Sequence, residues 1–71
     1  MEIKCNNYET KEIIKFMRDF TEKTQTSFAN DVNKKRNWCA KLEAGKSNIT
    51  LDAFIKLANI NNLEIIIRER K

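Results

Sequence analysis

The most informative features of this sequence at first reading are its absences. Proline and histidine do not occur, glycine occurs once, and no unbroken apolar run exceeds three residues. Such a chain contains no Pro/Gly-rich linker, internal repeat or low-complexity tract. Its apolar runs are far too short to cross a membrane, which takes about 20 apolar residues. We therefore expect one globular domain over residues 1–71, with no membrane partner.

The scarcity of metal-binding and catalytic side chains excludes further classes. With no histidine and only Cys5 and Cys39, no usual structural zinc site can form, so neither a metal nor a cofactor is expected. Paired carboxylates and a glycine-rich phosphate loop are also missing, so an enzyme is not expected. The start, Met1–Lys4, is too polar for a signal peptide, which favours the cytoplasm. A disulfide is not expected there, and Cys39 is interpreted as a small core residue.

What the sequence does have is a concentrated positive charge. The net charge is +4, and residues 33–46 hold five basic residues against one acidic residue. The rest of the chain carries nine residues of each sign and is neutral, so the whole excess lies in one short segment. A focused basic segment is typical of a protein that binds a polyanion such as nucleic acid, although a solvated lysine-rich surface would have the same composition.

The apolar pattern predicts a mostly α fold of four to five helices. The third of these should run from about Arg36 to Glu43 and end at Gly45, since glycine adopts the left-handed conformation without steric cost. Thr10, Thr24 and Thr50 are the expected N-caps of the other three. Phe28, Ala29, Val32, Cys39 and Leu42 should face the core. The first and fourth helices carry further apolar residues at helical spacing: Ile13, Ile14, Phe16, Met17, Phe20, Leu51, Phe54, Ile55, Leu57 and Ala58.

The last part of the chain has a different character. Leu63–Glu69 is rich in β-branched residues and predicts a short strand. A lone strand leaves its backbone groups without partners, so it must pair with Met1–Cys5 or with the same strand of a second subunit. Three consecutive isoleucines put apolar side chains on both faces, which favours the second subunit. The expected dimer interface consists of Leu63, Ile65, Ile66 and Ile67.

Residues 24–46 read TQTSFANDVNKKRNWCAKLEAGK and carry a family resemblance. Thr24–Gln25, Phe28–Ala29 and Leu42–Lys46 fall in register, without a gap, with the helix-turn-helix of the lambda repressor, Cro and xenobiotic-response-element family. The resemblance extends more loosely over Thr50–Ala58, and the first ten residues lie outside it. It implies a lambda-repressor-like bundle in which Ala29 lets two helices approach closely and Glu43 anchors neighbouring structure by hydrogen bonding.

Three positions depart from the family pattern. Asn33 replaces the turn glycine, a mild change because asparagine tolerates the left-handed conformation. Lys34 stands where the family has an apolar residue, so either one core contact is missing or the lysine extends its charge to solvent. Lys35 replaces the serine that caps the third helix, which leaves Asn33 as an alternative cap.

The resemblance also assigns roles at the DNA. The third helix would enter the major groove, where arginine pairs with guanine and asparagine with adenine. Trp38 could pack against the fourth helix or lie along the sugar-phosphate backbone, and we favour packing. The residues expected to read bases are Arg36, Asn37 and Lys41. The residues expected to contact or attract phosphates are Gln25, Lys34, Lys35, Lys46 and Asn48.

The expected function is therefore that of a sequence-specific, double-stranded DNA-binding regulator, a homodimeric repressor of an inverted-repeat operator. An antitoxin is the alternative, because the Arg-any-Trp run before Leu-Glu-any-Gly and the C-terminal strand resemble a subgroup that includes antitoxins. Such a protein would repress its own operon and bind a toxin. A third reading, from another class, is a protein-interaction module that has lost DNA binding, which the unusual Lys34 and Lys35 keep open.

Overall fold

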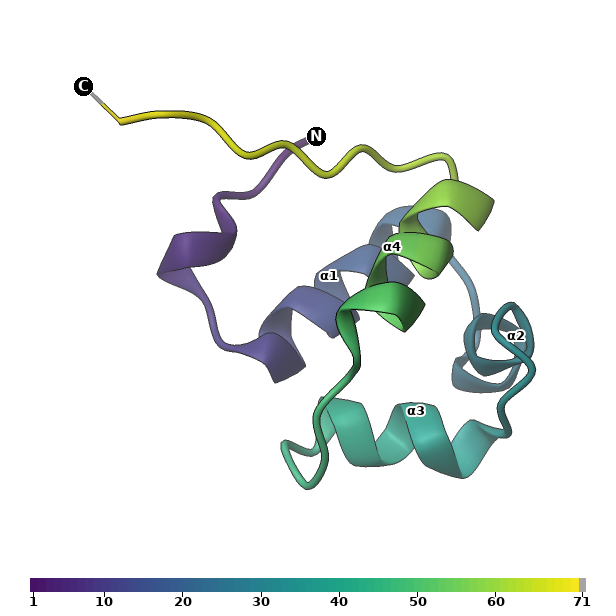
Figure 1. The fold of residues 1–71 in the computed structure, drawn as a ribbon. Coiled ribbons are helices and arrows are strands. Elements are labelled where there is room, and N and C mark those ends of the chain that lie inside the picture. The colour runs from purple at the N-terminus through teal and green to yellow at the C-terminus, as the bar shows by residue number, and fades with distance from the viewer. Residues whose placement is uncertain (71) are drawn as a thin grey trace.

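A computed structural model describes residues 1–70 of the chain, so Lys71, the end of the predicted domain, lies outside the described residues. The prediction of a mostly α fold is confirmed, with four α-helices around one core (Figure 1). A 3-10 turn, η1, spans Cys5–Asn7. The helices are α1 (Thr10–Thr21), α2 (Gln25–Asn30), α3 (Arg36–Glu43) and α4 (Leu51–Ile60). None of these helices is long and apolar enough to cross a membrane.

Two of the three predicted threonine caps are confirmed. The Thr24 hydroxyl accepts a hydrogen bond from the Ser27 amide, and the Thr50 hydroxyl accepts one from the Ala53 amide, both at 3.1 Å. The prediction for Thr10 is wrong, because Thr10 is already the first residue of α1 and Glu9 is the N-cap. The Glu12 carboxylate accepts a hydrogen bond from the Glu9 amide at 3.0 Å, which fixes the cap one residue before the predicted threonine.

The turn between α2 and α3 depends on a left-handed asparagine. Asn33 has φ +59°, as expected of the residue that replaces glycine there. The amide of Lys34 donates to the Ala29 carbonyl oxygen at 3.0 Å and closes the turn. Asn33 does not cap α3, so that alternative is wrong. The N-cap is Lys35, whose side chain makes no capping hydrogen bond. Lys34 is exposed, so the family's core contact at this position is missing.

At its other end, α3 stops at the predicted glycine. Gly45 has φ +76°, and the Lys46 amide donates to the Lys41 carbonyl oxygen at 2.9 Å. This hydrogen bond satisfies a carbonyl group that the helix leaves free. A Cβ atom at Gly45 would also lie 3.2 Å from Cδ of Lys11, so the loop passes close to the start of α1. The bounds predicted for α3 are confirmed.

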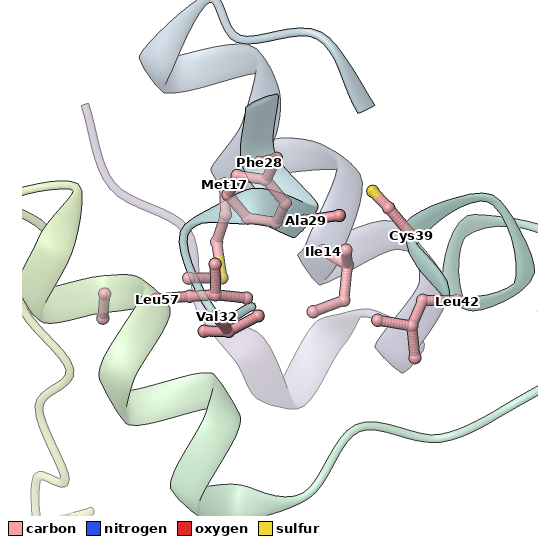
Figure 2. Close-up of a cluster of buried hydrophobic side chains, with 9 residues drawn as sticks. Ile14, Met17, Phe28, Ala29, Val32, Cys39, Leu42 and Leu57 are labelled. Atoms are coloured by element: carbon pink, nitrogen blue, oxygen red, sulfur yellow. The ribbon is translucent and has the colours of Figure 1, made fainter. Parts of the chain in front are cut away.

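Side chains from all four helices meet in the core, as Figure 2 shows. Ala29 is fully buried, and α2 and α3 make the most extensive contact of any pair of helices, as expected of a small side chain at a close crossing. Of the apolar residues that α4 carries, Leu51 and Ile55 are 70% and 42% exposed. They lie on a side of α4 that no other described helix covers. The buried residues are Ile14, Met17, Phe28, Ala29, Val32, Cys39, Leu42, Leu57 and Ala58.

The predicted strand at Leu63–Glu69 is not formed in the single chain. After the Leu63 amide donates to the Ala58 carbonyl oxygen at 2.8 Å, residues 64–70 make no backbone hydrogen bond to another described segment. Met1–Cys5 does not pair with them and leads into η1 instead. The physical reason is that strand backbone groups need a partner strand, which one copy of residues 1–70 does not provide. The tail, residues 63–70, extends past α4 in Figure 1.

Candidate nucleic-acid interface

The α3 helix presents opposite faces to the core and to solvent. Cys39 and Leu42 are buried on one side. Asn37 and Lys41, spaced four residues apart, project from the opposite side, and both are exposed. Arg36 flanks them at the first position of the helix and is also exposed. All three predicted base-reading residues are therefore exposed on α3, and Asn37 and Lys41 share the face opposite the core.

The expected phosphate-contacting lysines lie at the two ends of α3. Lys34 and Lys35 are exposed in the turn before the helix, and Lys46 and Asn48 are exposed in the loop after it. We call the exposed residues Lys34, Lys35, Arg36, Asn37, Lys41 and Lys46 the α3 surface.

The α3 surface carries positive charge that the protein does not neutralise. Ion pairs among residues 1–70 join Lys11 to Glu9, Arg18 to Glu43 and Lys23 to Asp31. No cation of the α3 surface takes part in any of them. Among residues 1–70, Lys4, Lys15, Lys56, Arg68 and Arg70 are also unpaired, but they are scattered along the chain, whereas the five cations of the α3 surface lie together within residues 34–46. An anionic partner would find an accessible face of one sign there.

Beneath this surface, Glu43 joins three helices. Its carboxylate receives two hydrogen bonds from the Arg18 guanidinium of α1, at 2.6 Å from Nε and 2.9 Å from Nη2. The Gln25 amide of α2 donates to it at 3.3 Å, and the Cys39 thiol of α3 at 3.2 Å. These four residues form the Glu43 cluster. The predicted anchoring role of Glu43 is confirmed, and it fixes α2 and α3 against α1.

The environment of the cluster sets the protonation states of its members. Burial raises the pKa of Glu43, but hydrogen bonds from Arg18, Cys39 and Gln25 outweigh this effect and hold the pKa below its ordinary value. Burial and the hydrogen bond to Glu43 raise the pKa of the Cys39 thiol to about 12. The hydrogen bond to Glu43 raises the pKa of Arg18. At neutral pH the cluster therefore consists of a carboxylate, a guanidinium and an unreactive thiol.

The structure gives Gln25 a second role besides the predicted one. It is half-buried at the first position of α2, and its side-chain amide already donates to Glu43. Because an amide nitrogen has two hydrogens, one remains for another acceptor. Contact between Gln25 and a phosphate stays a prediction.

Sequence reasoning missed Arg18 altogether. Arg18 follows Ile14 by four residues and Met17 by one, so it continues the apolar stripe of α1 into the interior. A basic residue in an apolar stripe must find a buried acceptor, and that signal could have pointed to Glu43. A second contact, also missed, links α2 to α4: the Asp31 carboxylate accepts from Lys23 Nζ at 2.7 Å and from Asn61 Nδ2 at 3.1 Å.

Trp38 packs within the protein, and contact of its indole with α4 stays a prediction. The indole is partly buried and packs against the core, and the core prediction for Cys39 is confirmed as well. No group of three or more histidine, cysteine, aspartate or glutamate residues within the described chain is arranged to hold a metal ion. Comparison of the chain with protein-family models, curated proteins and solved structures finds no match.

Proposed function

We propose that this chain is a helix-turn-helix regulator that inserts α3 into the major groove of double-stranded DNA. The observation that supports this proposal most is the α3 surface, an exposed helix face whose cations have no carboxylate partners among residues 1–70. An α-helix with its side chains is about 10–12 Å in diameter, which fits the major groove of about 12 Å width.

The arrangement of side chains suggests how recognition would work. Arg36 can donate two hydrogen bonds to guanine, and Asn37 can pair with adenine in the same bidentate manner. Lys41, one turn further along, reaches the next base edge. The exposed residues Lys34, Lys35, Lys46 and Asn48 flank α3, where they would meet the two phosphate backbones that border the groove and would fix the position of α3 without reading sequence. A regulator of chromosomal or phage genes would act in the cytoplasm.

The Glu43 cluster supports the same proposal by making the reading helix rigid. Base readout requires side chains to be held within fractions of an ångström, and rigid elements do this better than loops. The bidentate Arg18–Glu43 pair fixes α3 to α1, and the Gln25–Glu43 hydrogen bond with the close packing at Ala29 fixes α2 to α3. The α3 surface is therefore presented in one orientation before DNA arrives, which lowers the ordering cost of binding.

We further propose that two copies act together on an inverted repeat. The tail leaves Ile65, Ile66 and Ile67 exposed by 44%, 58% and 99%, and pairing with a second copy would cover them. A two-fold dimer that reads two half-sites on one face of the DNA would hold its two α3 helices about 34 Å apart.

A second candidate function, an antitoxin that represses its own operon, is favoured by the same exposed tail. Three exposed isoleucines after α4 offer an apolar surface to a toxin protein as well as to a second copy. Purification of the chain from its native cells distinguishes the candidates, since an antitoxin would bring a toxin partner with it in constant ratio.

A salt titration tests the proposal of DNA binding. Binding of the protein to a fluorescent duplex of random sequence should weaken steeply as salt rises, because counterions are released from each contacted phosphate. A chain without salt-dependent affinity for duplex DNA would contradict the proposal and leave the protein-interaction module as the better reading.

A further inference from the structure

The tail and α4 together form an apolar hollow. Leu63 packs against the core, and the chain then turns along α4, leaving an open hollow of about 460 Å³. Ile55 and Ala58 form one wall of this hollow, and the tail forms the other. The tail residues that contribute are Leu63, Glu64, Ile65 and Ile67.

Beyond Leu63, the backbone of the tail lacks hydrogen-bonding partners among residues 1–70, just as its isoleucine side chains lack apolar neighbours that would cover them. Residues 64–70 make no backbone hydrogen bond to any other segment of residues 1–70, so their N–H and C=O groups are open to another strand. An exposed segment with three adjacent isoleucines and a free edge is a template for pairing with a further chain. The sequence of the tail indicates what that chain is.

Two-fold symmetry restricts how two identical tails can pair. In an antiparallel pair, residues directly opposite each other point to the same face of the ribbon. A two-fold axis perpendicular to the ribbon that passes through a residue pair requires that one residue lie opposite its own copy. Three registers centred on an isoleucine are available, at Ile65, Ile66 and Ile67.

Only the register centred on Ile66 pairs every isoleucine with an isoleucine and also matches opposite charges. Centred on Ile66, it places Glu64 opposite Arg68 of the other copy, and Ile65 opposite Ile67. The register centred on Ile65 places Glu64 opposite an isoleucine. The register centred on Ile67 places Glu64 opposite Arg70, but it also places Arg68 opposite Ile66 and Ile65 opposite Glu69. Opposite charges and paired β-branched side chains both stabilise antiparallel strands.

We propose that two copies of this chain pair their tails antiparallel in the register centred on Ile66, with two Glu64–Arg68 pairs flanking the isoleucines. In this register, Ile65 and Ile67 of each copy cover the apolar hollow of the other. The inference deepens the dimer of the proposed function and rests on it, but it concerns contacts that are measured without DNA.

Charge reversal in the tail tests the register. In a dimer of the Glu64→Arg variant, each of the two charge pairs becomes a pair of facing arginines. In a dimer of the Arg68→Glu variant, each becomes a pair of facing glutamates. The Kd of self-association, measured by sedimentation equilibrium, should rise by about tenfold in each variant alone. When the two variants are mixed, both pairs become complementary again, so the mixture should form heterodimers with nearly the Kd of the wild type.

A matched control separates the register from net charge. Arg70→Glu changes the net charge by the same amount as Arg68→Glu, but in this register Arg70 lies opposite Asn62. Its Kd should stay within about twofold of the wild type. Equal weakening by Arg68→Glu and Arg70→Glu, no preference for heterodimers in the mixture, or a monomeric wild type would each overturn the proposal. A dimer that behaves as stated but has no affinity for DNA would overturn the proposed function and leave the register intact.

Discussion

At the scale of single residues, Glu43 and Arg18 show how a polar pair can organise a small core. The Glu43 side chain is 9% exposed and the Arg18 side chain 19%, so neither group is well hydrated. Their two hydrogen bonds, with those from Gln25 and Cys39, replace the lost water contacts. Removal of one partner leaves the other charge uncompensated, which costs more than the pair itself contributes.

Glu43→Gln should therefore lower the free energy of unfolding by about 2–4 kcal/mol, since the Arg18 guanidinium loses its carboxylate in a half-buried site. Urea denaturation followed by circular dichroism measures this change. Glu2→Gln, which removes one negative charge from an exposed position, is the control and should have almost no effect. Equal stabilities of the two variants would show that the Glu43 cluster does not hold the fold.

The same pair predicts how stability depends on pH. Because the folded pKa of Glu43 lies below its ordinary value of 4.5, its contribution is complete at neutral pH. The contribution is lost as the pH falls through the folded pKa, so the free energy of unfolding of the wild type should decline in acid more steeply than that of Glu43→Gln. A difference between the two proteins that did not change with pH would contradict this assignment.

Arg36 and Asn37 carry the prediction about base readout. Arg36→Ala and Asn37→Ala should each weaken operator binding by about 1–3 kcal/mol and relax the preference at one base pair per half-site. Both side chains are exposed, so thermal stability should be unchanged. Affinity for a panel of single-base operator variants provides the readout. If neither substitution changed that profile, α3 would not be the reading helix.

At the scale of secondary-structure elements, local chemistry made α3 predictable and left other features hidden. The bounds of α3 follow from Gly45 and from the spacing of Cys39 and Leu42, which are properties of neighbouring residues. The start of α1 was misplaced because Glu12 pairs with Glu9, so that Glu9 and not Thr10 is the cap. Arg18 was missed because its partner lies 25 residues away, and a partner at that distance is defined only by the folded chain.

The loop after α3 carries the prediction about phosphates. Lys46→Ala should weaken binding to all DNA sequences alike and flatten the dependence of log K on log salt by about one unit. The reason is that Lys46 is exposed beside α3 and lacks a carboxylate partner among residues 1–70. Lys56→Ala, which removes the same charge from α4, is a matched control and should leave the slope unchanged. An altered sequence preference at constant slope would speak against a phosphate contact by Lys46.

At the scale of the whole molecule, the tail is the segment whose conformation a single chain does not determine. Its β-branched composition predicted a strand, but a strand forms only when backbone partners are present, and residues 1–70 of one copy offer none. The exposure of Asn37 and Lys41, by contrast, could be predicted, because helix periodicity places them opposite Cys39 and Leu42. Their contacts with DNA come from the family resemblance and stay a prediction.

Deletion of residues 63–71 should yield a monomer with reduced stability, since it removes both the exposed isoleucines and the packing of Leu63 on the core. Operator binding should weaken because two half-sites are no longer linked. Sedimentation measures the mass, and a chain that lacks only residues 70 and 71 serves as a control that stays dimeric. A truncated chain that still sedimented as a dimer would place the interface on the exposed side of α4.

Selection of bound duplexes from a random pool tests the central claim most directly, since it requires no knowledge of the operator. The wild-type protein should enrich an inverted repeat whose half-site centres lie about 10 base pairs apart, one turn of DNA. The Arg36→Ala variant should enrich a motif that is degenerate at one position of each half-site. A pool that remained random after repeated rounds with the wild type would contradict the account of α3 as a sequence-reading helix.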